Sequence, residues 1–186
     1  MNFSHSDLTD WGLTHVSIEK DFTVLDVGCG GGRTIQKLAA IASEGLICGV
    51  DYAKGSVAAS LAKNAHHVAQ GRVKVQEASV SRLPFDDNTF DLVTAVETQY
   101  YWPDLVEDMR EILRVLKPGG TLAVIVESYK GGRNEIVHAP VMRLLRSTRL
   151  SIDEQKDLFS TAGYIGVQVF EEHDKGWLCA TGKKSA

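Results

Sequence analysis

Short apolar runs alternate with helical patterns through most of the chain. Five runs predict buried strands: Thr23–Val27, Leu46–Val50, Arg72–Gln76, Phe90–Val96 and Leu122–Val126. Between the first two runs, the apolar residues recur at helical spacing, at Ile35, Leu38, Ala39 and Ala42. Between the second and third runs, residues 54–68 also have a helical pattern. Strands that alternate with helices are typical of an α/β fold built on a parallel sheet.

A capping pair marks the helix before the fifth strand. Asp104 and Glu107 form a D-x-x-E pair, in which the glutamate is expected to reach back to the backbone amide of the cap residue. An amphipathic pattern follows as far as Leu116, and Pro118-Gly119-Gly120 predicts the end of the helix.

The last third of the chain predicts a helix followed by two strands. Ser151 and Glu154 form a second capping box, and Gly163 ends the helix that it opens. Residues 165–170 and 177–181 are expected to pair antiparallel across a polar turn.

Two further segments complete what we expect to be one domain, residues 1–186. Residues 3–18 predict a helix, and we interpret residues 1–20 as an N-terminal lid over the site. Residues 129–150 contain two glycines and several basic residues, which predicts a loop with a short helix over 141–145. This segment is a second candidate cover, and its brevity favours a small substrate.

Composition narrows the class of protein. The chain has 186 residues, 44% hydrophobic and 24% charged, with a net charge of −4 and scattered basic residues, which argues against a nucleic-acid partner. No apolar run approaches the roughly 20 residues that cross a bilayer, and no signal-peptide pattern opens the chain. The three cysteines lack disulfide or zinc spacing, so we expect a cytoplasmic protein without a metal site.

The first strand leads into a glycine-rich turn, Gly28 to Gly32, ahead of a helix. Glycines let the backbone approach a ligand closely, and the helix start offers unpaired amides, so the turn predicts a nucleotide-containing cofactor at the carboxyl ends of the strands. The fingerprint of a dinucleotide-binding loop, G-x-G-x-x-G or G-x-G-x-x-A, needs a small residue at its last position. This chain has Arg33 there. Asp26 would repel a pyrophosphate but suits a ligand that carries an ammonium group.

Four motifs in order resemble the class I S-adenosylmethionine-dependent methyltransferases, in the ubiquinone-biosynthesis-like subgroup. They are Val24-Leu25-Asp26-Val27-Gly28-Cys29-Gly30-Gly31-Gly32, Gly49-Val50-Asp51, the stretch from Leu83-Pro84-Phe85 to Phe90-Asp91-Leu92-Val93, and Arg114-Val115-Leu116-Lys117-Pro118-Gly119-Gly120. The resemblance covers residues 22–127. It implies a doubly wound, Rossmann-like sheet of seven strands, mostly parallel with the last strand antiparallel.

The resemblance also implies which residues bind S-adenosylmethionine. The methionine end would lie against Asp26 and the backbone of Gly28, Cys29, Gly30 and Gly32. Asp51 would accept hydrogen bonds from both ribose hydroxyls, and Tyr52 would pack beside the adenine. Family members usually hold the adenine edge with an acid followed by a backbone amide. This chain has Ser79 and then Val80 at those places, and a serine hydroxyl can also bond the exocyclic amine.

The segment after the fourth strand is the candidate acceptor side. Glu97 is a candidate general base, while Tyr100, Tyr101 and Trp102 either wall an acceptor pocket or pack under the next helix. No Pro-Pro pair follows this strand, which disfavours an amino group of a nucleobase or of glutamine as the acceptor.

We therefore expect metal-independent, in-line methyl transfer to a small molecule by a monomer or homodimer. Two rivals remain: a non-catalytic module that binds S-adenosylmethionine, and an NAD(P)-dependent oxidoreductase, against which Arg33 and Asp26 argue.

Overall fold

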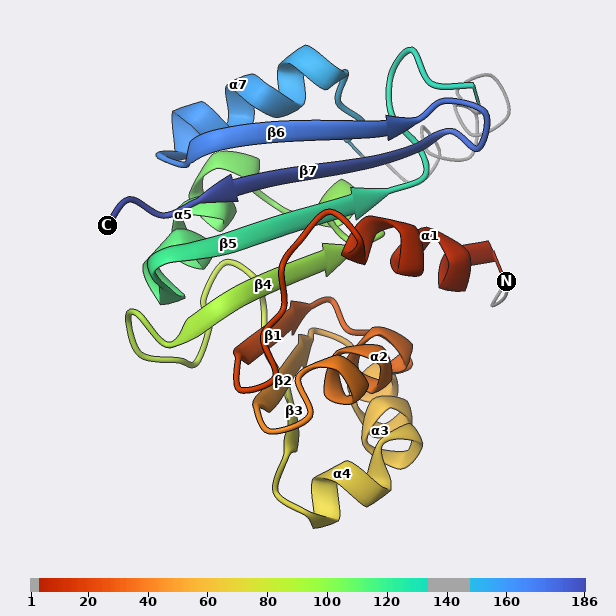
Figure 1. Cartoon of the computed structure of the whole chain (residues 1–186), viewed down its shortest axis with the longest axis vertical. Coiled ribbons are helices and arrows are strands. Elements are labelled where there is room, and N and C mark those ends of the chain that lie inside the picture. Colours follow the sequence, from red (N-terminus) through yellow and green to blue (C-terminus); the bar gives the residue numbers. More distant parts are fainter. Residues whose placement is uncertain (1–3, 134–147) are drawn as a thin grey trace.

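A computed structural model describes residues 4–133 and 148–186. Its centre is a seven-stranded sheet in the order β3-β2-β1-β4-β5-β7-β6 (Figure 1). The strands are β1 (Thr23–Val27), β2 (Leu46–Asp51), β3 (Val73–Glu77), β4 (Phe90–Val96), β5 (Leu116–Val126), β6 (Ile165–Glu172) and β7 (Trp177–Lys183). The first five strands pair in parallel, whereas β7 runs antiparallel to both β5 and β6. The predicted mostly parallel, doubly wound sheet is confirmed.

Helices cover both faces of this sheet. They are α1 (Ser4–Leu13), α2 (Arg33–Ile41), α3 (Lys54–Lys63), α4 (Ala65–Ala69), the short 3-10 helix η1 (Gln99–Tyr101), α5 (Leu105–Val115) and α7 (Ile152–Ala162). One apolar cluster packs α1 and α2 on the sheet, and a second packs α5 and α7 on the opposite face. Figure 1 shows α1 on the near side of the sheet and α5 on the far side. The central strands of the sheet therefore lie between two packed layers.

Some predicted boundaries differ from the structure. Helix α1 ends at Leu13, earlier than the predicted residue 18. Strand β5 begins at Leu116, because Leu116 pairs with Phe90 ahead of a register shift between the two strands, after which Leu92 pairs with Thr121. The predicted helix over 141–145 lies outside the described residues. The capping box of Ser151 and Glu154 is confirmed.

The predicted capping box at α5 is wrong in one member. Asp104 does cap the helix and accepts from the amides of Val106 and Glu107. However, the amide of Asp104 donates to the Asp108 carboxylate at 3.1 Å. The side chain of Glu107 instead binds Arg110 at 2.5 Å. Asp108 is buried and Glu107 is exposed. Because of this packing of α5, the acid that accepts from the cap amide is Asp108, one position after the predicted Glu107.

The two downstream motifs meet at Arg114. Its guanidinium donates to the backbone carbonyls of Leu83 and Phe85 at 3.1 and 2.8 Å and to the carboxylates of Asp87 and Glu111. The "R-x-LKPGG" arginine thus fixes the "LPF" turn, and this turn starts the chain toward β4. The role of these motifs in the described structure is architectural.

Candidate active site

The glycine turn between β1 and α2 needs glycine for steric reasons. Gly28 and Gly32 both have positive φ, 71° and 77°. A Cβ on Gly28 would lie 2.2 Å from Thr98 Oγ1, and one on Gly32 would lie 2.4 Å from Ser60 Oγ. A Cβ on Gly30 would meet nothing within 4 Å. The turn is therefore packed at both ends and open at its middle, which leaves room for a ligand against its backbone.

Hydrogen bonds join this turn to the end of β2 and to the residue that follows α3. The amides of Gly28 and Cys29 donate to the Val50 carbonyl, at 2.8 and 3.0 Å. The amide of Gly30 donates to Asp51 Oδ2 at 2.9 Å. At the far end, Asn64 Nδ2 donates to the Gly32 carbonyl at 2.9 Å.

Asn64 was missed by sequence reasoning. It is 2% exposed and lies just after α3. Its contact joins residues 32 positions apart, and no local pattern marks such a contact.

Two carboxyl groups lie at the base of the turn. Asp51 ends β2, is 8% exposed, and its Oδ1 accepts from the Ala53 amide at 2.9 Å. Asp26 lies in β1 and accepts from Thr94 Oγ1 at 2.7 Å. Burial raises the pKa of Asp26 to about 7, against the bond from Thr94 and with a smaller contribution from the charge of Asp51. The thiol of Cys29 beside them is buried, and burial raises its pKa to about 12.

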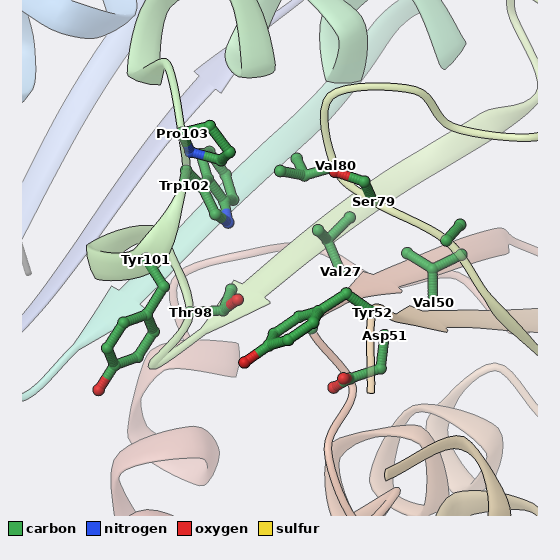
Figure 2. A pocket seen from close by; sticks show the side chains of 12 residues that line it. Val27, Val50, Asp51, Tyr52, Ser79, Val80, Thr98, Tyr101, Trp102 and Pro103 are labelled. Atoms are coloured by element: carbon green, nitrogen blue, oxygen red, sulfur yellow. The ribbon is translucent and has the colours of Figure 1, made fainter. Parts of the chain in front are cut away.

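A cavity of about 340 Å³ opens beside these acids (Figure 2). Its lining combines residues that the sequence suggested with five that it did not. The suggested ones are Gly28, Asp51, Tyr52, Ser79, Val80 and Tyr101, together with Trp102 as a possible pocket wall, and the others are Val27, Val50, Ala78, Thr98 and Pro103. Every lining residue lies at or after the carboxyl end of β1, β2, β3 or β4. This is the edge where a doubly wound sheet binds its ligand.

The other predicted site residues lie around this cavity rather than on the described part of its wall. Asp26, Cys29, Gly30 and Gly32 belong to β1 and the glycine turn, and Glu97 and Tyr100 follow β4; none of these six is among the described lining residues. The described lining also contains no residue of 4–20, so the lid role of the N-terminal segment stays a prediction. Helix α1 packs on the sheet, with Gly12 against Ile125 of β5.

Glu97 follows β4 with an unusual backbone, φ 57°. Its Oε1 accepts from the Glu127 amide at 2.6 Å and from the Tyr100 hydroxyl at 2.9 Å. Burial raises the pKa of Glu97 to about 7, and the charge of Glu127 adds to the shift, while the two hydrogen bonds oppose it. A strained, non-glycine residue with a displaced pKa at a strand end is a candidate for function.

The two tyrosines after Glu97 differ in environment. Tyr100 is 5% exposed, and its hydroxyl also accepts from the Ser128 amide at 3.0 Å. Its backbone carbonyl accepts from the Thr148 amide at 2.9 Å, so Tyr100 binds the chain at both sides of residues 129–147. Tyr101 is 53% exposed and lines the cavity, which Figure 2 shows with its ring at the cavity mouth.

In residues 4–133 and 148–186, no three His, Cys, Asp or Glu side chains lie together in a way that would hold a metal ion. Within the same ranges, no helix has the length and apolar character needed to cross a membrane.

Comparison with known proteins decides the family. The profile of the family described as "Methyltransferase domain" matches residues 25–124, from β1 into β5. The chain belongs to the class I S-adenosylmethionine-dependent methyltransferases. The resemblance of the four motifs is thereby confirmed, and S-adenosylmethionine is the cofactor of the family.

Curated relatives share part of their length with this chain. Methyltransferase GfsG of Streptomyces halstedii is 28% identical over 134 residues, which cover 72% of this chain and 48% of that protein. The demethylmenaquinone methyltransferase of Staphylococcus aureus is 33% identical over 117 residues, 62% of this chain and 47% of that protein. The chain spans about half the length, or less, of the curated relatives it matches.

Solved structures share the fold over nearly the whole chain. A SAM-dependent methyltransferase of Aquifex aeolicus superposes with a TM-score of 0.79 at 22% identity, covering 98% of this chain and 94% of that one. A chain from the complex of the Haloferax volcanii Trm112 methyltransferase activator with a methyltransferase gives 0.82 at 24% identity, covering 98% and 91%. At these identities the likeness establishes the fold alone.

The cavity fits the family's cofactor in size and chemistry. Its volume falls within the range of about 300–1,000 Å³ that is typical of small-molecule sites. The open middle of the glycine turn offers backbone to a polar chain, and Asp51 offers a carboxylate to a pair of hydroxyls.

Proposed function

We propose that this protein transfers the methyl group of S-adenosylmethionine to a small-molecule acceptor without a metal ion. The observation that carries the proposal is one continuous cavity. It joins Asp51, at the end of β2, to the Thr98–Pro103 segment after β4. Relatives named as sterol and demethylmenaquinone methyltransferases support a small acceptor. The three free cysteines favour a cytoplasmic location, which is part of the proposal.

Residues from three strand ends would bind the cofactor. Asp51, already oriented by the amides of Gly30 and Ala53, would accept the two ribose hydroxyls with its remaining lone pairs. Tyr52 would pack beside the adenine, whose edge would meet Ser79 and the Val80 backbone. The methionine end would follow the glycine turn, with its ammonium group on the side of Asp26.

The bound cofactor would supply an electrophilic methyl group, carried on a positively charged sulfur that is a good leaving group. The protein's main task is then to hold the acceptor in line behind the methyl group. Thr98 and Tyr101 line the cavity next to Gly28 and would form the acceptor wall.

Glu97 would take the proton when the acceptor atom carries one. A carboxyl group with a pKa of about 7 is partly ionised near neutral pH and more basic than an ordinary carboxylate, which suits a general base. Tyr100 would position Glu97 through its 2.9 Å hydrogen bond and would not itself react, because its hydroxyl is buried between Glu97 and the Ser128 amide. With Glu97 as base, kcat/KM should rise as the pH increases through about 7.

Calorimetric titration with S-adenosylhomocysteine, with NADH in a parallel cell, tests the proposal. Binding of S-adenosylhomocysteine but not of NADH supports assignment as a methyltransferase. Product formation with a panel of small acceptors then separates an enzyme from a non-catalytic binding module. Binding of NADH alone would refute the proposal, and so would binding of neither ligand.

A further inference from the structure

Trp102 places a hydrogen-bond donor in the wall of the cavity. The residue follows η1, where its own amide bonds the Gln99 carbonyl at 3.2 Å, and Pro103 follows it. Its side chain is 7% exposed and belongs to the apolar cluster that includes Val80. These contacts hold the indole in one place, so its nitrogen has a fixed position.

The indole nitrogen has no hydrogen-bond partner among the residues that the structure describes. An indole N–H is a donor only, and buried donors in proteins are almost always paired. Figure 2 shows the nitrogen directed into the cavity, toward the space between Val80 and Thr98. The donor therefore fits a ligand that brings a lone pair to this part of the wall.

The surroundings of Trp102 favour a flat aromatic ligand. The same cavity is lined by the apolar side chains of Val27, Val50 and Val80, and by Asp51. If Asp51 holds a ribose, the base attached to that ribose enters this apolar region. The edge of an adenine carries ring nitrogens with free lone pairs.

We propose that the Trp102 indole N–H donates a hydrogen bond to a ring nitrogen of the cofactor's adenine and so helps to select adenine. This role rests on the proposed function. It adds a side-chain donor to the adenine site, where Ser79 stands in place of the family's usual acid. An oxygen or nitrogen of the methyl acceptor offers the same lone pair, and the test separates the two sources.

Deaza analogues of S-adenosylhomocysteine give the sharpest test, because each replaces one ring nitrogen by C–H. The 1-deaza, 3-deaza and 7-deaza compounds are titrated calorimetrically into the wild type and into Trp102→Phe, which keeps an aromatic ring and removes the donor. We expect the wild type to bind one analogue roughly 10- to 100-fold more weakly than S-adenosylhomocysteine, because that analogue leaves a buried donor unpaired. Trp102→Phe should bind S-adenosylhomocysteine more weakly and should no longer distinguish that analogue from it.

Trp177→Phe is the matched control. Trp177 is 8% exposed, lies on β7 and packs beside Trp11, away from the cavity lining. This variant should keep the wild-type affinities and the wild-type discrimination, with melting temperatures recorded for both variants.

Each remaining outcome refutes a different statement. Equal affinity of the wild type for all four compounds, or discrimination that survives in Trp102→Phe, would overturn the role of Trp102. Discrimination that disappears equally in Trp177→Phe would overturn it as well. A wild type that binds no S-adenosylhomocysteine would instead refute the proposed function, and the role of Trp102 with it.

Discussion

Glu97 should make the protein less stable at neutral pH than an uncharged residue would. Its buried Oε1 accepts from the Glu127 amide and the Tyr100 hydroxyl, and a glutamine Oε1 can accept the same two bonds. The variant Glu97→Gln therefore keeps the side-chain shape and these two bonds while it removes the negative charge.

The size and sign of the effect follow from the pKa of Glu97. A pKa of about 7 in place of 4.5 corresponds to a free-energy cost of about 3 kcal/mol for the ionised group. The folded protein holds the proton more tightly than the unfolded chain does. The stabilisation that protonated Glu97 contributes is thus complete below the pKa that Glu97 has in the unfolded chain. It is lost as the pH rises through about 7, the pKa of Glu97 in the folded protein. Local relaxation reduces the cost of a buried charge, so we expect Glu97→Gln to be more stable by about 1–2 kcal/mol at about pH 8.

Urea unfolding of both proteins between about pH 4.5 and 8.5 measures this difference. It should approach zero at the acidic end and grow across the window around pH 7. Glu107→Gln is the control, because Glu107 is an exposed carboxylate on α5 whose removal should leave a small, nearly pH-independent difference. A difference for Glu97→Gln that does not change with pH, or a variant that is less stable at about pH 8, would refute the reasoning. If Glu97 is the base, the more stable variant should also lose the rise of kcat/KM through pH 7.

Three further predictions concern the site and its supports. Asp51→Asn should weaken S-adenosylhomocysteine binding roughly 100-fold by calorimetry, because it replaces a carboxylate oxygen by an amide that cannot accept; a change within about twofold would contradict the ribose role. Asn64→Leu should weaken that binding about five- to tenfold and speed hydrogen exchange at the glycine turn, because it removes the bond to the Gly32 carbonyl. The control variant Leu61→Ala on α3 should leave both the affinity and the hydrogen exchange unchanged. Equal effects of Asn64→Leu and Leu61→Ala would mean that Asn64 only stabilises the fold. Arg114→Met should lower the urea-derived free energy of unfolding by about 2–3 kcal/mol, and a loss below about 0.5 kcal/mol would contradict its bridging role.

The fold could be predicted from the sequence because its signals are local. Buried strands such as Leu46–Asp51 begin as short, mostly apolar runs, and the helix after Ser151 carries its own cap. Boundaries were less predictable where pairing partners decide them. Lys117-Pro118-Gly119-Gly120 has poor strand propensity, yet it lies within β5, since Leu116 pairs with Phe90.

In the candidate site too, residues in local motifs could be predicted, whereas residues brought in by packing could not. Gly28 and Asp51 were predicted because Gly28 directly follows β1 and Asp51 ends β2, each within a motif, and both line the cavity. The contact of Thr98 with Gly28 depends on β4 lying beside β1, and the contact of Asn64 with Gly32 depends on the packing of α3. Neither contact produces a pattern in the local sequence. Trp102 was anticipated as a possible wall of an acceptor pocket, but the unpaired state of its nitrogen can be seen only in the structure.

The sheet order explains why the motifs identify the cofactor class and leave the acceptor open. Strand order reverses between β1 and β4, so the connections after these strands leave toward opposite faces and open a crevice at their carboxyl ends. Asp51 and the glycine turn lie on the β1–β2 side of this crevice, within the matched motifs. Glu97 and Glu127 lie on the other side, after β4 and β5. Apart from Trp102, whose proposed partner is the adenine, substitutions on the β4–β5 side should therefore change acceptor specificity, and substitutions on the β1–β2 side should change cofactor affinity for every acceptor alike.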